Sequence, residues 1–154
     1  MNYLNNFAKD LQIGKIAETE FIQTLSTCYP KYSNFQYNDS TSLEQLRKYD
    51  VSFTGTKRDY TVEVKFDVKS SQTGNFAFEI YYKGSPSGIQ STQADFFAVK
   101  SGNQFFVFNT KKLRSRLLNQ PHKWRITDII NGTATVILVP MDEIKELAEV
   151  LQIA

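Results

Sequence analysis

Charged and apolar side chains alternate over residues 60–67, which read YTVEVKFD. In an extended strand, side chains two positions apart share a face at a spacing of about 6.6–6.8 Å, so Glu63 and Lys65 project together. The apolar residues between and beside them are expected to enter the core: Val62, Val64 and Phe66. A carboxylate beside an ammonium group suits metal-assisted hydrolysis of a phosphodiester, although a half-exposed strand shows the same alternation.

A second carboxylate, Asp50, opens the preceding run DVSFTG, 13 residues before Glu63. The linker TGTKRD, with Gly55 and polar neighbours, is typical of a hairpin loop, and antiparallel pairing then brings Asp50 beside Glu63 and Lys65. Two carboxylates and a backbone carbonyl, here that of Val64, make a hard oxygen site for Mg²⁺, with Mn²⁺ as an alternative. The ion would polarise a phosphodiester and activate a bound water, while Lys65 would hold that water or stabilise charge on the phosphate.

The first helix is predicted over residues 5–27, where apolar residues recur at helical spacing until Pro30 breaks the pattern. These residues are Phe7, Leu11, Ala17, Phe21 and Leu25. At about 100° per residue, Glu18 falls closer to the centre of this apolar face than Glu20 does. We expect Glu18 to be either a buried carboxylate that needs a partner or a boundary residue whose tip stays in water.

These residues resemble the active-site motif of the PD-(D/E)XK nuclease superfamily: Asp50, then EVK at positions 63–65 after a hairpin. The proline that names the motif is absent, since Tyr49 precedes Asp50, and this proline is often missing in the superfamily. The helix segment GKIAETEF resembles the opening helix of archaeal Holliday junction resolvases in this superfamily. There a glycine precedes a metal-site glutamate by four residues, as Gly14 precedes Glu18.

The resemblance covers roughly residues 10–118, and residues 73–99 are similar to a segment of small phage-encoded endonucleases of this class. It implies an α/β fold with a restriction-endonuclease-like core, in which helices flank a mixed central sheet. It also implies a Mg²⁺-dependent deoxyribonuclease, a DNA endonuclease that hydrolyses phosphodiester bonds and that is suited to junction or branched DNA. The catalytic residues would be Asp50, Glu63, Lys65 and Glu18. The metal ligands would be Asp50, Glu63, Glu18 and the carbonyl of Val64.

The remaining elements follow from local patterns along the chain, whose 154 residues suit one domain over residues 1–154. Strands are predicted at 35–37, 49–53, 60–67, 76–82, 95–100, 104–109 and 133–139. Helices or helical turns are predicted at 43–48, 89–94, 110–118 and 141–152, with Thr110 as an N-cap. Residues 70–75 and 83–88 are rich in turn formers. This order of elements indicates a mixed α/β domain.

A second group of residues is predicted to contact DNA phosphates through ammonium, guanidinium, hydroxyl and amide groups. The candidates are Lys57, Arg58, Lys69, Ser87, Gln90, Thr92, Gln93 and Lys111. Lys111 belongs to a basic block over residues 100–127 that holds seven Lys or Arg and no Asp or Glu, whereas the chain from Met141 onward is acidic. Taken singly, each candidate is also explained by an ordinary solvated surface.

The sequence leaves the positions of two further carboxylates, Asp67 and Glu79, open between two alternatives each. Asp67 is predicted to share the face of Glu63 and Lys65, two residues further along the strand. It is either an outer group of the site or a solvated residue at the end of the strand. Glu79 falls between two apolar residues of the strand predicted at 76–82, and either approaches the site or faces water.

Several other kinds of chemistry are excluded by composition. Cys28 is the only cysteine and His122 the only histidine, which rules out an internal disulfide and zinc sites made of thiolates or several imidazoles. No glycine-rich phosphate loop of the Walker type occurs. The chain shows no secretory signal and no apolar run of about 18 residues, so we expect no membrane association and a cytoplasmic location, that of the host cell if a phage encodes the protein.

DNA is therefore the predicted partner. A resolvase-like substrate would favour a homodimer, because two symmetric cuts need two sites, whereas a nuclease for linear DNA would not require one. A non-catalytic nucleic-acid-binding module on the same scaffold would explain the basic block without a metal site. A protein-interaction domain would explain the charged strand as merely amphipathic.

Overall fold

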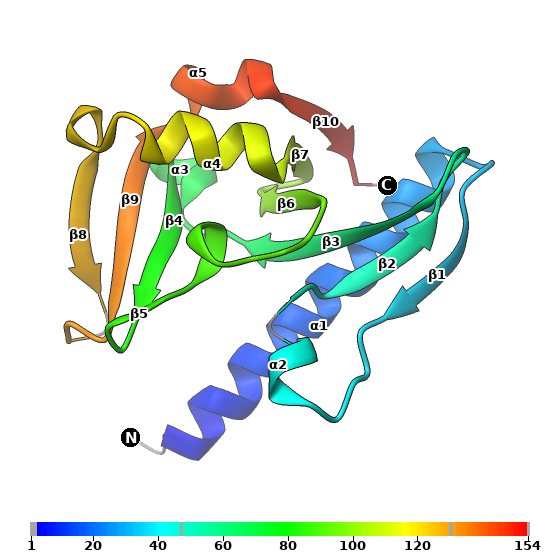
Figure 1. The fold of residues 1–154 in the computed structure, drawn as a ribbon, viewed down its shortest axis with the longest axis horizontal. Helices are drawn as coiled ribbons and strands as arrows, with labels where there is room; N and C mark the ends of the chain where they lie inside the picture. The colour runs from blue at the N-terminus through cyan, green and yellow to red at the C-terminus, as the bar shows by residue number, and fades with distance from the viewer. Residues whose placement is uncertain (1–2, 47, 130, 154) are drawn as a thin grey trace.

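The computed structural model describes residues 3–46, 48–129 and 131–153, with side chains from Gln12 onward within these ranges. It shows a mixed α/β fold, as the sequence predicted, with the strands arranged in two sheets (Figure 1). None of the helices in the described ranges combines the length and the apolar character that a bilayer crossing needs.

The larger sheet contains six strands in the order β1-β2-β3-β6-β7-β10. These strands span Ser33–Tyr37, Val51–Thr54, Asp59–Phe66, Phe96–Ser101, Gln104–Asn109 and Ala148–Gln152. β3 and β6 pair in parallel, and the other neighbouring strands of this sheet are antiparallel, so the sheet is mixed. The antiparallel hairpin predicted for the two strands that carry Asp50 and Glu63 is confirmed as β2 and β3.

The smaller sheet has the order β5-β4-β9-β8 and is antiparallel throughout. Its strands span Ser85–Pro86, Asn75–Tyr82, Ala134–Pro140 and Arg125–Ile129. β4 and β9 were predicted, whereas β8 and the two-residue β5 were not. In Figure 1 this sheet stands on the left, apart from β1 and β2.

One long helix, α1 (Tyr3–Cys28), lies against one face of the larger sheet and confirms the first predicted helix. Its apolar face is confirmed by the burial of Ala17, Phe21 and Leu25, while the side chains of Phe7 and Leu11 lie outside the described part of the chain. The other helices are α2 (Leu43–Leu46), α3 (Ser70–Thr73), α4 (Thr110–Leu118) and α5 (Met141–Ile144), with 3₁₀ turns η1 (Gly88–Gln90), η2 (Pro121–Lys123) and η3 (Lys145–Leu147).

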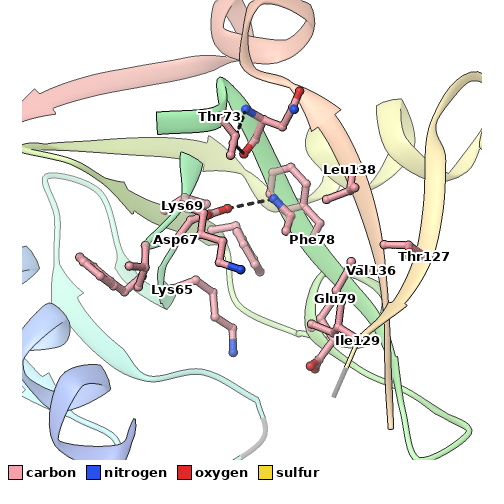
Figure 2. A pocket seen from close by; sticks show the side chains of 17 residues that line it. Lys65, Asp67, Lys69, Thr73, Phe78, Glu79, Thr127, Ile129, Val136 and Leu138 are labelled. Atoms are coloured by element: carbon pink, nitrogen blue, oxygen red, sulfur yellow. Dashed lines mark hydrogen bonds between the residues drawn. The ribbon is translucent and has the colours of Figure 1, made fainter. Parts of the chain in front are cut away.

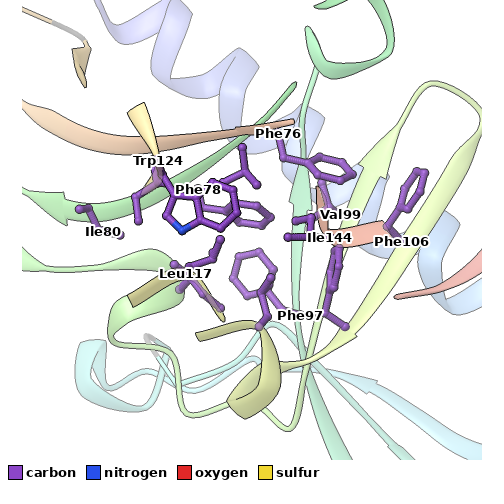
Figure 3. Close-up of a cluster of buried hydrophobic side chains, with 14 residues drawn as sticks. Phe76, Phe78, Ile80, Phe97, Val99, Phe106, Leu117, Trp124 and Ile144 are labelled. Carbon is purple, nitrogen blue, oxygen red and sulfur yellow. The ribbon is translucent and has the colours of Figure 1, made fainter. Parts of the chain in front are cut away.

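Two hydrophobic cores lie on the two faces of the larger sheet. The first joins α1 to β2, β3 and the centre of the sheet, where Val62 and Val64 are buried as predicted. The second fills the space between the larger sheet, the smaller sheet and α4, and is rich in aromatic rings (Figure 3). β6 and β7 contribute to both, because successive strand residues point to opposite faces: Ala98 enters the first core and Phe97 the second.

The helix predicted over residues 141–152 is wrong. Only α5 and η3 are helical there, and the chain then forms β10, which pairs with β7 through Val150 opposite Phe106 and Leu151 opposite Phe105. Ile144, Leu147 and Leu151 have a spacing that also fits one continuous helix. The pattern alone therefore could not distinguish such a helix from a short helical segment followed by a strand. Pairing prevailed because β10 satisfies the N–H and C=O groups along one edge of β7.

The predicted start of α4 is wrong by one residue. Thr110 is the first residue of the helix, and Asn109 is its N-cap, with Oδ1 accepting a hydrogen bond from the N–H of Lys112 at 3.1 Å. Asparagine ranks among the best N-cap residues because its short side chain reaches the free N–H groups of the first turn.

Candidate active site

Asp50 lies where β2 begins, beside the middle of β3. Its N–H donates to the carbonyl of Val62 at 2.9 Å, and its Oδ2 accepts from the N–H of Val64 at 2.7 Å. The β2–β3 ladder ends with Val51 opposite Val62, so β3 continues past the end of its neighbour. The N–H and C=O of one strand residue point to the same side, and the carbonyl of Val64 therefore faces the space beyond the end of β2.

That space is a cavity of about 540 Å³, which we call the acidic cavity. Glu18 and Lys15 of α1, Asp50, and Val64 and Lys65 of β3 are among the residues that line it. Four of the predicted site residues, Glu18, Asp50, Val64 and Lys65, are thus brought together by three separate elements. Glu63 does not line this cavity.

Glu18 is the inward carboxylate that the helical geometry favoured, with a side chain only 16% exposed. Its Oε2 lies 3.4 Å from Lys15 Nζ, but this buried oxygen has no hydrogen-bond partner among the described residues. Burial raises the pKa of Glu18, and the negative charge of Asp50 adds to the effect. A buried carboxylate oxygen without a donor costs stability unless another group neutralises it.

Glu63 and Lys65 form an ion pair on the opposite face of β3 from Val62 and Val64, as predicted. Lys65 Nζ lies 3.2 Å from Glu63 Oε1, and Thr92 Oγ1 donates to Glu63 Oε2 at 3.4 Å. Burial raises the pKa of Glu63 to about 7, and the charge of Asp50 also raises it, while Lys65 and Thr92 act in the opposite direction. Burial likewise raises the pKa of Asp50, against the lowering effects of Lys65 and the N–H of Val64.

Lys65 is 48% exposed and faces both the acidic cavity and a second cavity described below. Partial burial tends to lower the pKa of its amine, but the carboxylates of Glu63 and Asp50 outweigh this and raise it, so the amine stays cationic. The cluster therefore holds three partly or fully buried carboxylates around one lysine that is firmly charged.

The donor chemistry of the acidic cavity fits a hard divalent cation. Carboxylate and carbonyl oxygens are the ligands that Mg²⁺ prefers, and an added positive charge would offset the burial that raises the pKa of Glu18 and Asp50. Among the described residues, however, no three His, Cys, Asp or Glu side chains are grouped closely enough to hold a metal ion. Glu63 is not a third carboxylate of this group, because its two oxygens are directed to Lys65 and Thr92.

The segment that contains Thr92 contacts Glu63 and the backbone just before Asp50. The single hydroxyl hydrogen of Thr92 is shared between Glu63 Oε2 and the carbonyl of Lys48, which lies 3.3 Å from Oγ1. The N–H of Gln93 also donates to the carbonyl of Lys48, two residues before Asp50, at 3.3 Å. Arg114 of α4 holds this segment, donating from Nε to the carbonyl of Ile89 at 2.9 Å and from Nη2 to the carbonyl of Thr92. Thr92 is buried, so its hydroxyl orients Glu63 and is not placed to contact a phosphate as predicted.

Two of the other seven predicted phosphate contacts, Arg58 and Gln90, are engaged within the protein. Arg58 pairs with Asp95 at 3.2 Å and stacks over Tyr60, and Gln90 Nε2 donates to the hydroxyl of Tyr81 at 3.3 Å. Ser87 is half-buried, and its Oγ has no partner among the described residues. Lys57, Lys69, Gln93 and Lys111 have exposed side chains.

Three of the seven basic residues in the block pair with carboxylates from other parts of the chain. Lys100 pairs with Glu20, Arg116 with Glu146 and Lys123 with Glu143. Lys111 lines a hollow on α4 that shares no residue with the acidic cavity. Lys112, Arg116 and Lys123 line the same hollow, so these basic residues gather at a place separate from the acidic cavity.

The two carboxylates left open by the sequence take different positions. Asp67 binds backbone: Oδ1 accepts from the N–H of Ser70 at 3.1 Å and Oδ2 from that of Ala77 at 2.9 Å. It joins the end of β3 to β4 and is neither a free strand end nor part of the acidic cavity. Glu79 is half-buried and lines the second cavity together with Lys65, whose pKa it helps to raise.

The second cavity, which we call the inter-sheet cleft, lies between the end of β3 and the smaller sheet and has a volume of about 540 Å³ (Figure 2). Lys65, Phe66 and Val68 line both cavities, so the two hollows adjoin. No sequence pattern pointed to this cleft, because β8 and β9 meet β3 only through the tertiary fold.

No protein-family model, curated protein or solved structure matches this chain. The likeness to PD-(D/E)XK nucleases therefore stays a prediction that depends on the motif residues themselves. What the geometry adds is that most of these residues line one cavity, with Glu63 beside it.

Proposed function

We propose that this protein is a Mg²⁺-dependent DNA endonuclease with a restriction-endonuclease-like core. The observation that supports it most directly is the acidic cavity, where Glu18, Asp50 and Lys65 meet at the backbone of Val64. A solvated amphipathic strand would account for Glu63 and Lys65 alone. It does not account for Glu18 of α1, a largely buried carboxylate at the same place, whose Oε2 lacks a hydrogen-bond donor in the described part of the chain.

Glu18, Asp50 and the carbonyl of Val64 would hold Mg²⁺, with Mn²⁺ as an alternative and Glu63 as a further ligand. Bound Mg²⁺ supplies polarisation of the scissile phosphate and a lower pKa for its coordinated water. Mg²⁺ sites commonly use one or two protein carboxylates, with water and phosphate oxygens completing the shell. Glu18 and Asp50 therefore suffice in number even where Glu63 stays paired with Lys65.

The role of Lys65 follows from its charge and position. Its amine is held 3.2 Å from Glu63 Oε1, which orients it at the junction of the two cavities. There it would bind a phosphate oxygen and stabilise the negative charge that builds up as the phosphodiester is attacked. The resemblance to resolvases makes junction or branched DNA the proposed substrate, cut by a homodimer so that two strands are cleaved symmetrically.

The experiment is a cleavage assay with linear, nicked and four-way branched DNA, in Mg²⁺ and in chelator. We expect metal-dependent products from the wild-type protein and none from Asp50→Asn or Glu18→Gln. A second readout is Mg²⁺ or Mn²⁺ binding by calorimetry without DNA, which both substitutions should weaken. Glu20→Gln is the matched control, because Glu20 lies on the same helix but pairs with Lys100 outside the acidic cavity.

Loss of cleavage in Glu20→Gln to the same degree as in Glu18→Gln would show that helix stability, not the acidic cavity, limits the reaction. Absence of any metal-dependent product from every DNA would reject the proposed hydrolysis itself.

A second candidate function is a nucleic-acid-binding module without catalysis. One observation favours it: the carboxylates are not gathered into a three-residue metal group among the described residues. It predicts salt-sensitive DNA binding that persists unchanged in Asp50→Asn and Glu63→Gln, together with a wild-type protein that cuts no substrate.

A further inference from the structure

The inter-sheet cleft begins where the proposed catalytic site ends. Lys65 lines both hollows, so a DNA strand whose phosphate lies at its amine would have the neighbouring nucleotide at the mouth of the cleft. Figure 2 shows Lys65 and Lys69 on one side of this space and the side chains of the smaller sheet on the other.

The two walls of the cleft differ in chemistry. The wall from β8 and β9 is mostly apolar and includes Ile129, Val136 and Leu138. The opposite wall, at the end of β3, carries the amines of Lys65 and Lys69 and also Asp67, whose two carboxylate oxygens accept from the backbone N–H groups of Ser70 and Ala77. An apolar surface facing a cationic rim matches the two ends of a nucleotide, whose base is flat and weakly hydrated and whose phosphate is anionic.

We propose that the inter-sheet cleft takes one unpaired nucleotide of the bound DNA, with its base against the β8–β9 wall and its phosphate toward Lys65 and Lys69. The volume of about 540 Å³ suits a single nucleotide and is far too small for a duplex. Glu79 at the same cleft adds a carboxylate that repels phosphate and accepts hydrogen bonds from a base. This inference rests on the proposed function for the path of the strand, and it identifies the substrate as DNA with an unpaired base.

The test uses two exposed isoleucines on the same strand. Ile129 is 40% exposed and lines the cleft, whereas Ile126 is 49% exposed and does not. Ile129→Asp places a carboxylate on the apolar wall, and Ile126→Asp makes the same change of charge and shape elsewhere on β8. The probes are a short duplex with one unpaired 2-aminopurine and the same duplex with that base paired, bound to the full chain in chelator so that no cutting occurs.

We expect the wild-type protein and Ile126→Asp to bind the unpaired probe about tenfold more tightly than the paired one, with a change in 2-aminopurine fluorescence. Ile129→Asp should lose both the preference and the fluorescence change while it still binds paired DNA. Equal affinity of the wild-type protein for the two probes, or equal behaviour of the two variants, would overturn the inference.

Cleavage of the same duplexes in Mg²⁺ separates this inference from the proposed function. Cutting of paired DNA without any preference for the unpaired probe would retain the nuclease and reject the occupant of the cleft. Selective binding that depends on Ile129, without cutting of any substrate, would retain the cleft and reject the nuclease.

Discussion

The acidic cavity and the surface around α4 both gather charged side chains, but they satisfy these charges differently. On α4 and the C-terminal segment, Arg116 meets Glu146 at 3.0 Å and Lys123 meets Glu143 at 3.5 Å, and all four side chains are more than one-third exposed. In the acidic cavity the carboxylates are largely buried, and one oxygen of Glu18 has no hydrogen-bond donor among the described residues.

This difference shows which charges in the sequence carry functional information. Exposed opposite charges pair at little cost and contribute little to stability, so a basic block in the sequence says little about binding. Buried carboxylates with raised pKa values cost stability, and proteins keep such arrangements mainly where binding or catalysis uses them. Substitutions in the acidic cavity should therefore change stability and cleavage, whereas substitutions on the α4 surface should change neither.

The largest expected effect is the loss of cleavage on removing the amine of Lys65. We expect Lys65→Ala to lower the cleavage rate at least about 100-fold, because a positioned cation that stabilises a developing negative charge contributes this much. The measurement is a single-turnover rate with Mg²⁺ and branched DNA. Lys112→Ala on α4 is the control, and a similar loss there would mean that general phosphate attraction, not position, explains the result.

The cost of burying Glu63 is testable through the pH dependence of unfolding. Burial raises the pKa of Glu63 to about 7, against about 4.3 in an unfolded chain. Between these values the folded state holds a proton that the unfolded state has lost, so the stability contribution of this group falls as pH rises and its penalty is complete above about pH 7. Without metal, Glu63→Gln should raise the free energy of unfolding by on the order of 2–3 kcal/mol at about pH 8.

The same substitution should give almost no stabilisation at about pH 5, where Glu63 is protonated in the folded protein. Chemical denaturation at both pH values in chelator measures the difference. Asp50, Lys65 and Thr92 surround Glu63, and a stabilisation that is equal at both pH values would attribute the effect to these contacts and not to the buried charge.

The support that Thr92 gives to Glu63 should have a smaller effect, about tenfold on the cleavage rate or on the Mg²⁺ concentration needed for half the maximal rate. Thr92→Val removes the hydroxyl that contacts Glu63 Oε2 and the carbonyl of Lys48. Thr92→Ser keeps the hydroxyl and should restore both values. A loss of stability with unchanged Mg²⁺ dependence would make Thr92 a purely structural residue.

The parts of the site that could be predicted from the sequence depend on local periodicity. The two-residue alternation of β3 correctly placed Val62 and Val64 inside and Glu63 and Lys65 on the other face, and the hairpin correctly placed Asp50 beside them. The helical angle of Glu18 correctly favoured its inward position. Each of these inferences needed only the geometry of one element or of two adjacent strands.

The parts that could not be predicted depend on contacts between distant segments. Arg114 was grouped with a basic block, yet it holds the backbone of Ile89 and Thr92 on a different element. The segment of β10 was expected to be helical because the spacing of its apolar residues also fits a helix. Its pairing partner, β7, is about 40 residues earlier in the chain, and local spacing does not encode that pairing. The inter-sheet cleft has the same origin, since it needs β8, β9 and the end of β3 together.

The smallest effect is expected on the α4 surface. Arg116→Ala removes the ion pair with Glu146 and a hydrogen bond from Nη1 to the carbonyl of Glu143 at 3.2 Å. Because these groups are exposed, water and salt replace the lost contacts, and we expect the midpoint of thermal unfolding and the cleavage rate to stay close to those of the wild-type protein. A large fall in DNA affinity at low salt, with the unfolding midpoint unchanged, would instead place nucleic acid on α4 and break the contrast between the two regions.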